Sequence, residues 1–194
     1  MNFDQILVER NRREQAIRDS VTMTSMSRHS LRKALDSSNP DRHTWLASYT
    51  EEYNGLVALD TFTTINRADL AASDFVGKPM PTMCVLTIKT DEFHNPVRAK
   101  SRIVVLGNLE SRMWTTAECY SPVLRQDSLR LLTSIAMENQ CVLKQGDYKN
   151  AFCQPHLPID EVVIVAPPAG CPISTPGTLW RLNKTLYGLR RSPR

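Results

Sequence analysis

The sequence predicts an α+β fold, and the order of four elements leads to this prediction. A β-hairpin candidate spans about residues 82 to 106, and a long amphipathic helix begins near Ser128. A strand ending at Asp147 and a pair of short strands follow the helix. The chain has 194 residues, of which 41% are hydrophobic, enough to build a core. Its formal net charge of +4 permits a polyanionic partner without proving one.

Residues 1–38 are predicted to form a polar, loosely ordered N-terminal segment with one or two polar helices. Its arginines are interpreted as a solvated face, because surface exposure is the usual state of arginine. Asn39 and Pro40 then mark a helix start, since Asn caps helices and Pro suits the first turn. Apolar residues at helical spacing extend this helix to about Leu59: Trp45, Leu46, Tyr49, Tyr53, Leu56 and Val57.

Three extended segments follow this helix. Residues 61–65 are β-branched and alternate, which favours a strand. Residues 83–89 and 97–106 suit the two strands of a hairpin, and residues 91–96 supply the turn between them. The middle of the sequence is therefore predicted to be a β-hairpin.

A basic face is predicted on this hairpin. Arg98, Lys100 and Arg102 alternate along its second strand, so their side chains share one face, which Lys89 could join. Such a face suits contact with phosphates. It is equally typical of a solvated edge strand, because Lys and Arg protect strand edges. The sequence pattern alone does not choose between these two interpretations.

The second half contains the clearest helix and three more strands. Residues 128–139 are predicted to be helical, with Asp127 or Ser128 as the cap. Strands are predicted at 141–147, 162–166 and 178–182. The predicted buried face of the helix consists of Leu129, Leu132, Ile135 and Ala136.

Asp147 ends the first of these strands, and Phe152 follows five residues later. A rigid strand can aim a carboxylate at its end toward a metal ion or a phosphate. The alternative is an ordinary turn acid after a buried strand, because single motifs often match by chance.

Cysteine and histidine spacing predicts neither zinc binding nor a disulfide framework. The 5 cysteines and 4 histidines are scattered and contain no Cys-x-x-Cys pair. The first residues lack a basic region followed by an apolar run, and no apolar stretch is long enough to span a membrane. We therefore expect an intracellular protein, cytoplasmic or nuclear, without a membrane partner.

Five segments, in order, resemble the reverse transcriptase of copia-type long-terminal-repeat retrotransposons. The central one, residues 145–152, is similar to the family's Met-Asp-Val-Lys-Asn-Ala-Phe segment. The other four are residues 98–107, 120–123, 167–170 and 179–190. The resemblance covers roughly residues 43 to 194, and the shared order makes it stronger than any single match.

The resemblance implies a partial right-hand polymerase, with a fingers hairpin over an incomplete palm, in residues 39–194. It implies that Asp147 is the catalytic residue and a metal ligand, beside the backbone carbonyl of Tyr148. The metal would be Mg²⁺ or Mn²⁺, with two ions in the complete domain. The implied partners are an RNA or DNA primer–template and deoxynucleoside triphosphates.

The resemblance also assigns contact residues. Phe152 would lie under the sugar of the incoming nucleotide and exclude a ribose 2′-OH, although a core aromatic is the alternative. The implied nucleotide-binding residues are Phe152, Lys89, Lys100, Arg102, Tyr187 and Gly188. The implied nucleic-acid-binding residues are Arg98, Arg181, Lys184, Arg190 and Arg191.

The family's second acidic motif, Tyr-Val-Asp-Asp, is not found in these residues. We therefore expect a fragment of an RNA-directed DNA polymerase that is inactive alone. The alternative is a non-catalytic, nucleic-acid-binding remnant of a transposon. We also expect the palm sheet to be left with an unpaired edge beside Asp147 and an uncovered apolar face.

Overall fold

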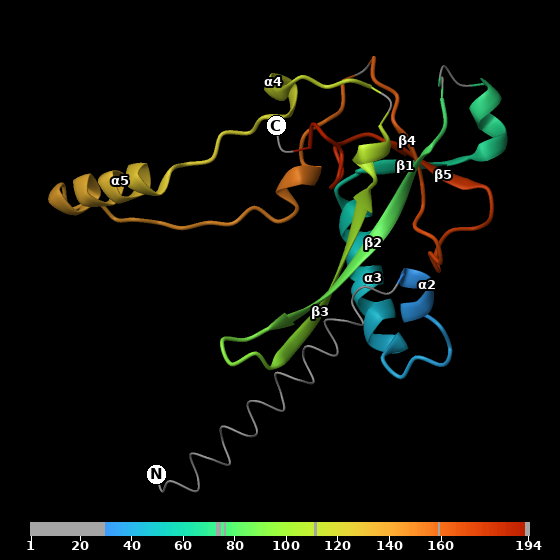
Figure 1. Ribbon diagram of the computed structural model, residues 1–194, viewed down its shortest axis with the longest axis horizontal. Coiled ribbons are helices and arrows are strands. Elements are labelled where there is room, and N and C mark those ends of the chain that lie inside the picture. The colour runs from blue at the N-terminus through green and yellow to red at the C-terminus, as the bar shows by residue number, and fades with distance from the viewer. Residues whose placement is uncertain (1–29, 73–74, 76, 111, 159, 193–194) are drawn as a thin grey trace, which may run out of the picture.

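The computed structural model describes residues 30–72, 75, 77–110, 112–158 and 160–192 (Figure 1). The polar helices predicted before residue 30 lie outside these ranges. The described part confirms a mixed α+β fold with one five-stranded sheet in the order β1-β5-β4-β2-β3. Within it, no helix combines the length and apolar character that a membrane span requires.

The sheet confirms most of the predicted strands. The long β2–β3 hairpin pairs in antiparallel register from Thr82–Val105 to Thr90–Pro96. The shorter strands pair antiparallel with one another, whereas β2 and β4 pair in parallel. The strands are β1 Phe62–Asn66, β2 Met80–Thr90, β3 Pro96–Val105, β4 Ile164–Ala166 and β5 Thr178–Leu182.

The helix predicted after Pro40 is confirmed as α3, Arg42–Ala58. Its N-cap residue is Asp41 and not the predicted Asn39. The side chain of Asn39 instead donates a hydrogen bond to the Ala34 carbonyl at 2.7 Å. The other α-helices are α2 Leu31–Ala34, α4 Thr116–Cys119 and the 13-residue α5 Gln126–Glu138, and the 3₁₀ turns are η1 Arg67–Ala72, η2 Gly107–Leu109 and η3 Ala151–Cys153.

The core lies between α3 and the sheet. Tyr49 and Leu56 of α3 are fully buried, since apolar residues four and seven apart fall on one helical face. Trp180 of β5 stacks on Phe62 of β1, with ring centroids 4.4 Å apart, and lies 6.0 Å from Tyr53 of α3. This aromatic cluster joins the helix to both strands, so it fixes where α3 lies over the sheet.

The predicted helix near residue 128 is present as α5, but its predicted buried face is wrong. No residue of α5 is buried, and Leu129, Leu132 and Ile135 are 54%, 55% and 46% exposed. Figure 1 shows α5 standing away from the sheet at the end of two extended connections. The apolar stripe of α5 is therefore left exposed. The expected unpaired sheet edge beside Asp147 is wrong, because residues 141–148 belong to no described strand.

The predicted strand over residues 141–147 is also wrong. Residues 141–148 form no regular structure and are exposed throughout. A strand needs a neighbour to receive its backbone hydrogen bonds. None of the described strands pairs with this segment, so its β-propensity has no ladder to join.

Leu132 supplies a direct test of this arrangement. Leu132→Ser is expected to change the free energy of unfolding by less than about 0.5 kcal/mol, because the side chain is already largely in water. Leu182→Ser in the buried part of β5 should cost several times more. Urea unfolding of both variants measures the contrast, and equal losses would mean that α5 is packed after all.

Candidate functional site

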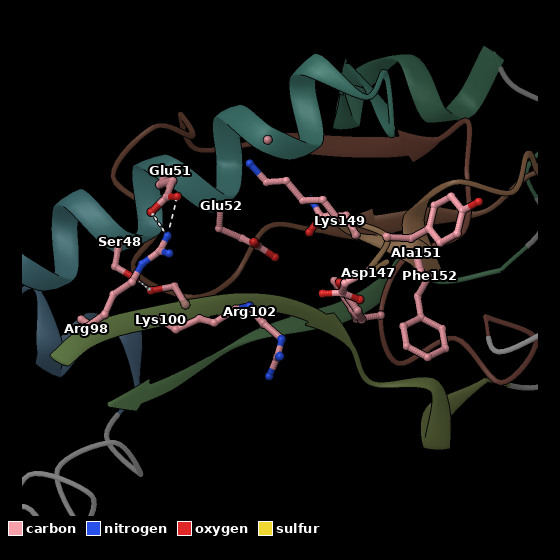
Figure 2. Close-up of a pocket in the computed structure, with 16 residues that line it drawn as sticks. Ser48, Glu51, Glu52, Arg98, Lys100, Arg102, Asp147, Lys149, Ala151 and Phe152 are labelled. Atoms are coloured by element: carbon pink, nitrogen blue, oxygen red, sulfur yellow. Dashed lines mark hydrogen bonds and ion pairs between the residues drawn. The ribbon is translucent and has the colours of Figure 1, made fainter. Parts of the chain in front are cut away.

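A cavity of about 700 Å³ opens between α3, β3 and the segment from Asp147 to Phe152 (Figure 2). It brings together residues that are distant in the sequence. Seven of the residues predicted as site residues line it: Arg98, Lys100, Arg102, Asp147, Tyr148, Phe152 and Tyr187. Two others, Lys89 and Gly188, are not among its lining residues in the described part of the chain.

Strand β3 carries three of the four basic residues that line the cavity, and Lys149 is the fourth. Ser101 of β3 is buried against α3, where its hydroxyl lies 2.9 Å from that of Ser48. Lys89 on β2 is the register partner of Arg98 and is exposed. In the view of Figure 2, Arg98 reaches toward α3, whereas the guanidinium of Arg102 lies on the other side of the β3 ribbon.

Arg98 is already paired with an acid. Its guanidinium donates to both carboxylate oxygens of Glu51 at 2.5 and 2.6 Å. This hydrogen bond is the main reason why the pKa of Glu51 lies below its ordinary value. Both side chains are more than half exposed, so the pair adds little stability. It does offset the charge of Arg98. Of the predicted basic residues that line the cavity, Lys100 and Arg102 form no ion pair with a described residue.

Asp147 reaches the cavity from an irregular segment rather than from a strand end. The chain then turns through Asn150, whose φ of 54° is left-handed, a conformation that Asn tolerates. This turn starts η3 and places Phe152 beside the Tyr187 ring, with centroids 5.7 Å apart. Phe152 is 43% exposed, so it is not the core aromatic of the alternative interpretation.

The turn at Tyr187 and Gly188 is held against the end of β3. The Val105 N–H donates to the Tyr187 carbonyl at 2.7 Å. Gly188 has a φ of 90° and lies so close that an added Cβ would overlap the Val105 carbonyl. Gly107 approaches the Gly188 carbonyl equally closely. Two glycines therefore allow the backbone contact that positions Tyr187 at the cavity.

The remaining predicted cations lie outside the lining of the cavity. Arg191 is ion-paired with Glu161, and its guanidinium lies 5.8 Å from the centre of the Trp114 ring. The side chain of Arg190 donates to the Gly107 carbonyl at 3.1 Å. Lys184 forms an isolated β-bridge to His156, and the exposed Arg181 pairs in register with Thr63. Their role in nucleic-acid binding stays a prediction.

Several lining residues were not predicted as site residues, among them the charged Glu51, Glu52 and Lys149. Glu52 lies on α3, and its Oε1 is buried with no hydrogen-bond partner among the described residues. Burial raises its pKa, and the Ile103 N–H, Lys100 and Arg102 oppose that shift. The sequence did contain a signal, because residue 52 falls on the helical face of Tyr49 and Leu56.

Asp147 is the one predicted carboxylate metal ligand in the cavity. Across the described residues, no group of three or more His, Cys, Asp or Glu side chains could hold a metal ion. A two-ion centre needs several carboxylates. The residues described here therefore do not make up such a centre, and Asp147 with the Tyr148 carbonyl could contribute only part of one.

Comparison with known proteins gives a consistent family. The family model described as "Reverse transcriptase (RNA-dependent DNA polymerase)" matches residues 69–194. A Pol polyprotein from transposon RE2 of Arabidopsis thaliana is 29% identical over 169 residues, covering 84% of this chain and 11% of the relative. The Pol polyprotein from transposon TNT 1-94 of Nicotiana tabacum is 29% identical over 167 residues, covering 85% and 12%. No solved structure matches.

The chain thus spans about a ninth of the length of these two relatives. The matches confirm the resemblance to copia-type retrotransposon polymerases that the sequence segments indicated. The family match extends from Asp69, just after β1, and includes the hairpin, Asp147 and the Tyr187 turn. The chain belongs to the reverse transcriptase (RNA-dependent DNA polymerase) family.

Proposed function

We propose that these residues supply the fingers and the first part of the palm of an RNA-directed DNA polymerase, so the fold is a partial right-hand polymerase. In this proposal the β2–β3 hairpin is the fingers, and the cavity takes a deoxynucleoside triphosphate beside a primer–template. The observation that supports it most is the convergence of Lys100, Arg102, Asp147, Phe152 and Tyr187 on one cavity.

Each lining residue then has a role that its chemistry permits. Lys100 and Arg102 would contact phosphate oxygens, since charge-assisted hydrogen bonds to phosphate are strong. The Phe152 ring, set at an angle to Tyr187, would leave no room for a ribose 2′-OH. Arg98 would contact nucleic acid only after leaving Glu51, which makes it a weaker contributor.

Asp147 and the Tyr148 carbonyl would hold Mg²⁺ or Mn²⁺. Such an ion, when bound, stabilises charge on the attacking and leaving oxygens. Phosphoryl transfer depends almost entirely on positioning and on this charge stabilisation. Because the described residues offer a single predicted carboxylate ligand, we infer that the 194-residue polypeptide alone does not extend a primer.

Nucleic-acid binding and primer extension by this polypeptide test the proposal. We expect no extension with Mg²⁺ or Mn²⁺, together with weak binding of a primer–template that falls with salt. Each phosphate neutralised changes the log–log salt slope by about 0.9, so the double variant Lys100→Gln/Arg102→Gln should reduce the slope by about 1.8. Lys33→Gln/Lys78→Gln removes the same charge from exposed positions outside the cavity and should leave most of the slope intact.

Three results would contradict different parts of the proposal. Primer extension that disappears in Asp147→Asn would mean that the polypeptide finds its other metal ligands elsewhere. Binding that is indifferent to salt, or equally weakened by both double variants, would remove Lys100 and Arg102 from phosphate contact. Binding of primer–template without any binding of deoxynucleotides would instead favour the transposon-remnant alternative.

A further inference from the structure

A half-buried glutamate in the cavity, Glu52, has no role in the proposal so far. Glu52 extends from α3 into the space between the helix and β3 (Figure 2). Its Oε1 is buried without a hydrogen-bond partner in the described part of the chain. None of the ion pairs among the described residues includes Glu52. An unsatisfied buried polar atom costs free energy, so its retention at a cavity wall calls for a partner that arrives with a ligand.

We propose that Glu52, in its protonated form, donates a hydrogen bond to a phosphate oxygen held by Lys100, so that binding takes up one proton. This inference rests on the proposed assignment of the cavity to phosphate. The proton comes from solvent, and the only bond formed is the O–H of the carboxyl group. Glu52 is thereby a further ligand-contacting residue rather than a metal ligand.

The charges around Glu52 come from every element packed against it. On its own helix, Glu51 opposes ionisation, although Arg98 offsets most of that charge. On β3, Lys100, Arg102 and the Ile103 N–H favour the carboxylate. The neighbouring thiols and phenol, all neutral near pH 7, are those of Cys84 on β2, Cys153 on η3 and Tyr187.

The loop from Asp147 to Asn150 brings two further charges to the same cavity. The charge of Lys149 helps to lower the pKa of Glu51, and the charge of Asp147 helps to raise the pKa of Tyr187. The balance of all these groups leaves the Glu52 pKa above its ordinary value, because desolvation outweighs the two cations of β3. The carboxyl group is therefore already biased toward the neutral form before a ligand binds.

A bound phosphate would strengthen that bias. It would bring negative charge beside Glu52 and would compete for Lys100, the nearer of the two cations that favour the carboxylate. An ionised Glu52 would repel the phosphate, whereas a protonated one can donate to it. A cationic ligand fits less well, since it would have to lie beside two basic residues.

The variants Glu52→Gln and Glu52→Met separate donation from charge. Glutamine keeps a hydrogen-bond donor without a titrating group, and methionine keeps the length without a donor. Glu51→Gln is the matched control, since it removes one carboxylate from the same helix turn. The pKa of Glu51 lies below its ordinary value, so Glu51 stays ionised above pH 5. Removing this residue should therefore shift the affinity but leave its pH dependence above pH 5 in place. Far-UV circular dichroism checks that each variant is folded.

Calorimetric titration between pH 5.5 and 8.5, in two buffers of different protonation enthalpy and with EDTA, measures affinity and proton uptake together. The first probe is an oligo(dT) of eight nucleotides, whose phosphodiesters do not titrate in this range. The second is dTTP, whose terminal phosphate does titrate there, so for dTTP the uptake due to Glu52 is the difference between wild type and Glu52→Gln. For the wild-type chain we expect affinity to fall by up to tenfold per pH unit above the Glu52 pKa, with uptake approaching one proton. With oligo(dT), Glu52→Gln should lose this dependence and keep the low-pH affinity. Glu52→Met should bind at least threefold more weakly than Glu52→Gln.

The outcomes distinguish this inference from the proposed function. Equal pH profiles for wild type and Glu52→Gln would overturn the proton coupling while leaving phosphate binding intact. Equal affinities of Glu52→Gln and Glu52→Met would overturn the hydrogen bond. If neither probe binds to the wild-type chain at any pH, the proposed function fails and this inference fails with it. Coupling seen with dTTP alone assigns the phosphate to a free nucleotide, and coupling seen with oligo(dT) alone assigns it to a strand backbone.

Discussion

Replacing Gly188 with alanine is expected to lower the free energy of unfolding by about 3 kcal/mol or more. Two effects add at this position. A residue with a Cβ is strained at a φ of 90°. The new Cβ would also overlap the Val105 carbonyl oxygen, which is backbone and cannot move aside as a side chain could.

The same substitution should disturb the cavity as well as stability. Separating Gly188 from β3 would break the hydrogen bond from the Val105 N–H to the Tyr187 carbonyl. Tyr187 would then lose its position beside Phe152. We therefore expect Gly188→Ala to weaken salt-dependent nucleic-acid binding even under conditions where the chain remains folded.

Gly146→Ala is the control for this prediction. An added Cβ at Gly146 meets no atom within 4 Å, and its φ is not left-handed. Its effect on unfolding should stay within about 1 kcal/mol, with a small gain possible because alanine restricts the unfolded chain. Gly107→Ala should behave like Gly188→Ala, because a Cβ at Gly107 would overlap the Gly188 carbonyl oxygen. If Gly188→Ala and Gly146→Ala unfold at the same urea concentration, the close contact does not exist.

The strands predicted correctly from the sequence are those whose partners are also in the described residues. The alternation of residues 97–106 predicts a strand. That prediction is correct because β2 pairs with β3 and α3 covers one of its faces. The short strands β4 and β5 were predicted for the same reason, since each pairs with its neighbour and buries its apolar side chains. Local pattern and tertiary contact agree at these positions.

The failures share one physical cause. Helical periodicity predicts a helix at α5 and the residues that share one of its faces, and the helix is present. Periodicity does not provide the surface that would bury Leu129 or Ile135. Likewise, residues 141–147 have strand propensity, but a strand forms only where a second strand accepts its hydrogen bonds. Both errors assumed a covering element that the described residues do not contain.

The site was predicted in an uneven way. The resemblance supplied Lys100, Arg102 and Asp147, and the cavity brings all three together. It could not supply Glu52, because no segment that resembles the family includes this residue. The helical pattern places residue 52 on the same face as the buried Tyr49. A glutamate is nevertheless predicted to be exposed, because charged residues are rarely buried. The burial of its Oε1 depends on β3 packing across α3, which the pattern of the helix alone does not predict.

Trp180→Ala is expected to have the second large effect, a loss of about 3–5 kcal/mol in the free energy of unfolding. Trp180 is 1% exposed and stacks on Phe62, so its removal leaves a cavity and not merely less contact. The loss should lower the melting temperature by about 10 °C or more. Tyr120→Ala is the matched control, since Tyr120 is an aromatic residue that is 63% exposed, and its melting temperature should be nearly unchanged.

Trp180 also connects stability to the cavity. It packs against Tyr53 of α3, the helix that carries Glu51 and Glu52. A shift of α3 after Trp180→Ala would move both glutamates relative to Lys100 and Arg102. We therefore expect the pH dependence of phosphate binding to weaken in Trp180→Ala at temperatures where circular dichroism still reports a folded chain. An unchanged pH profile in a measurably destabilised variant would show that α3 is held over β3 by other contacts, of which the Ser48–Ser101 hydrogen bond is the nearest candidate.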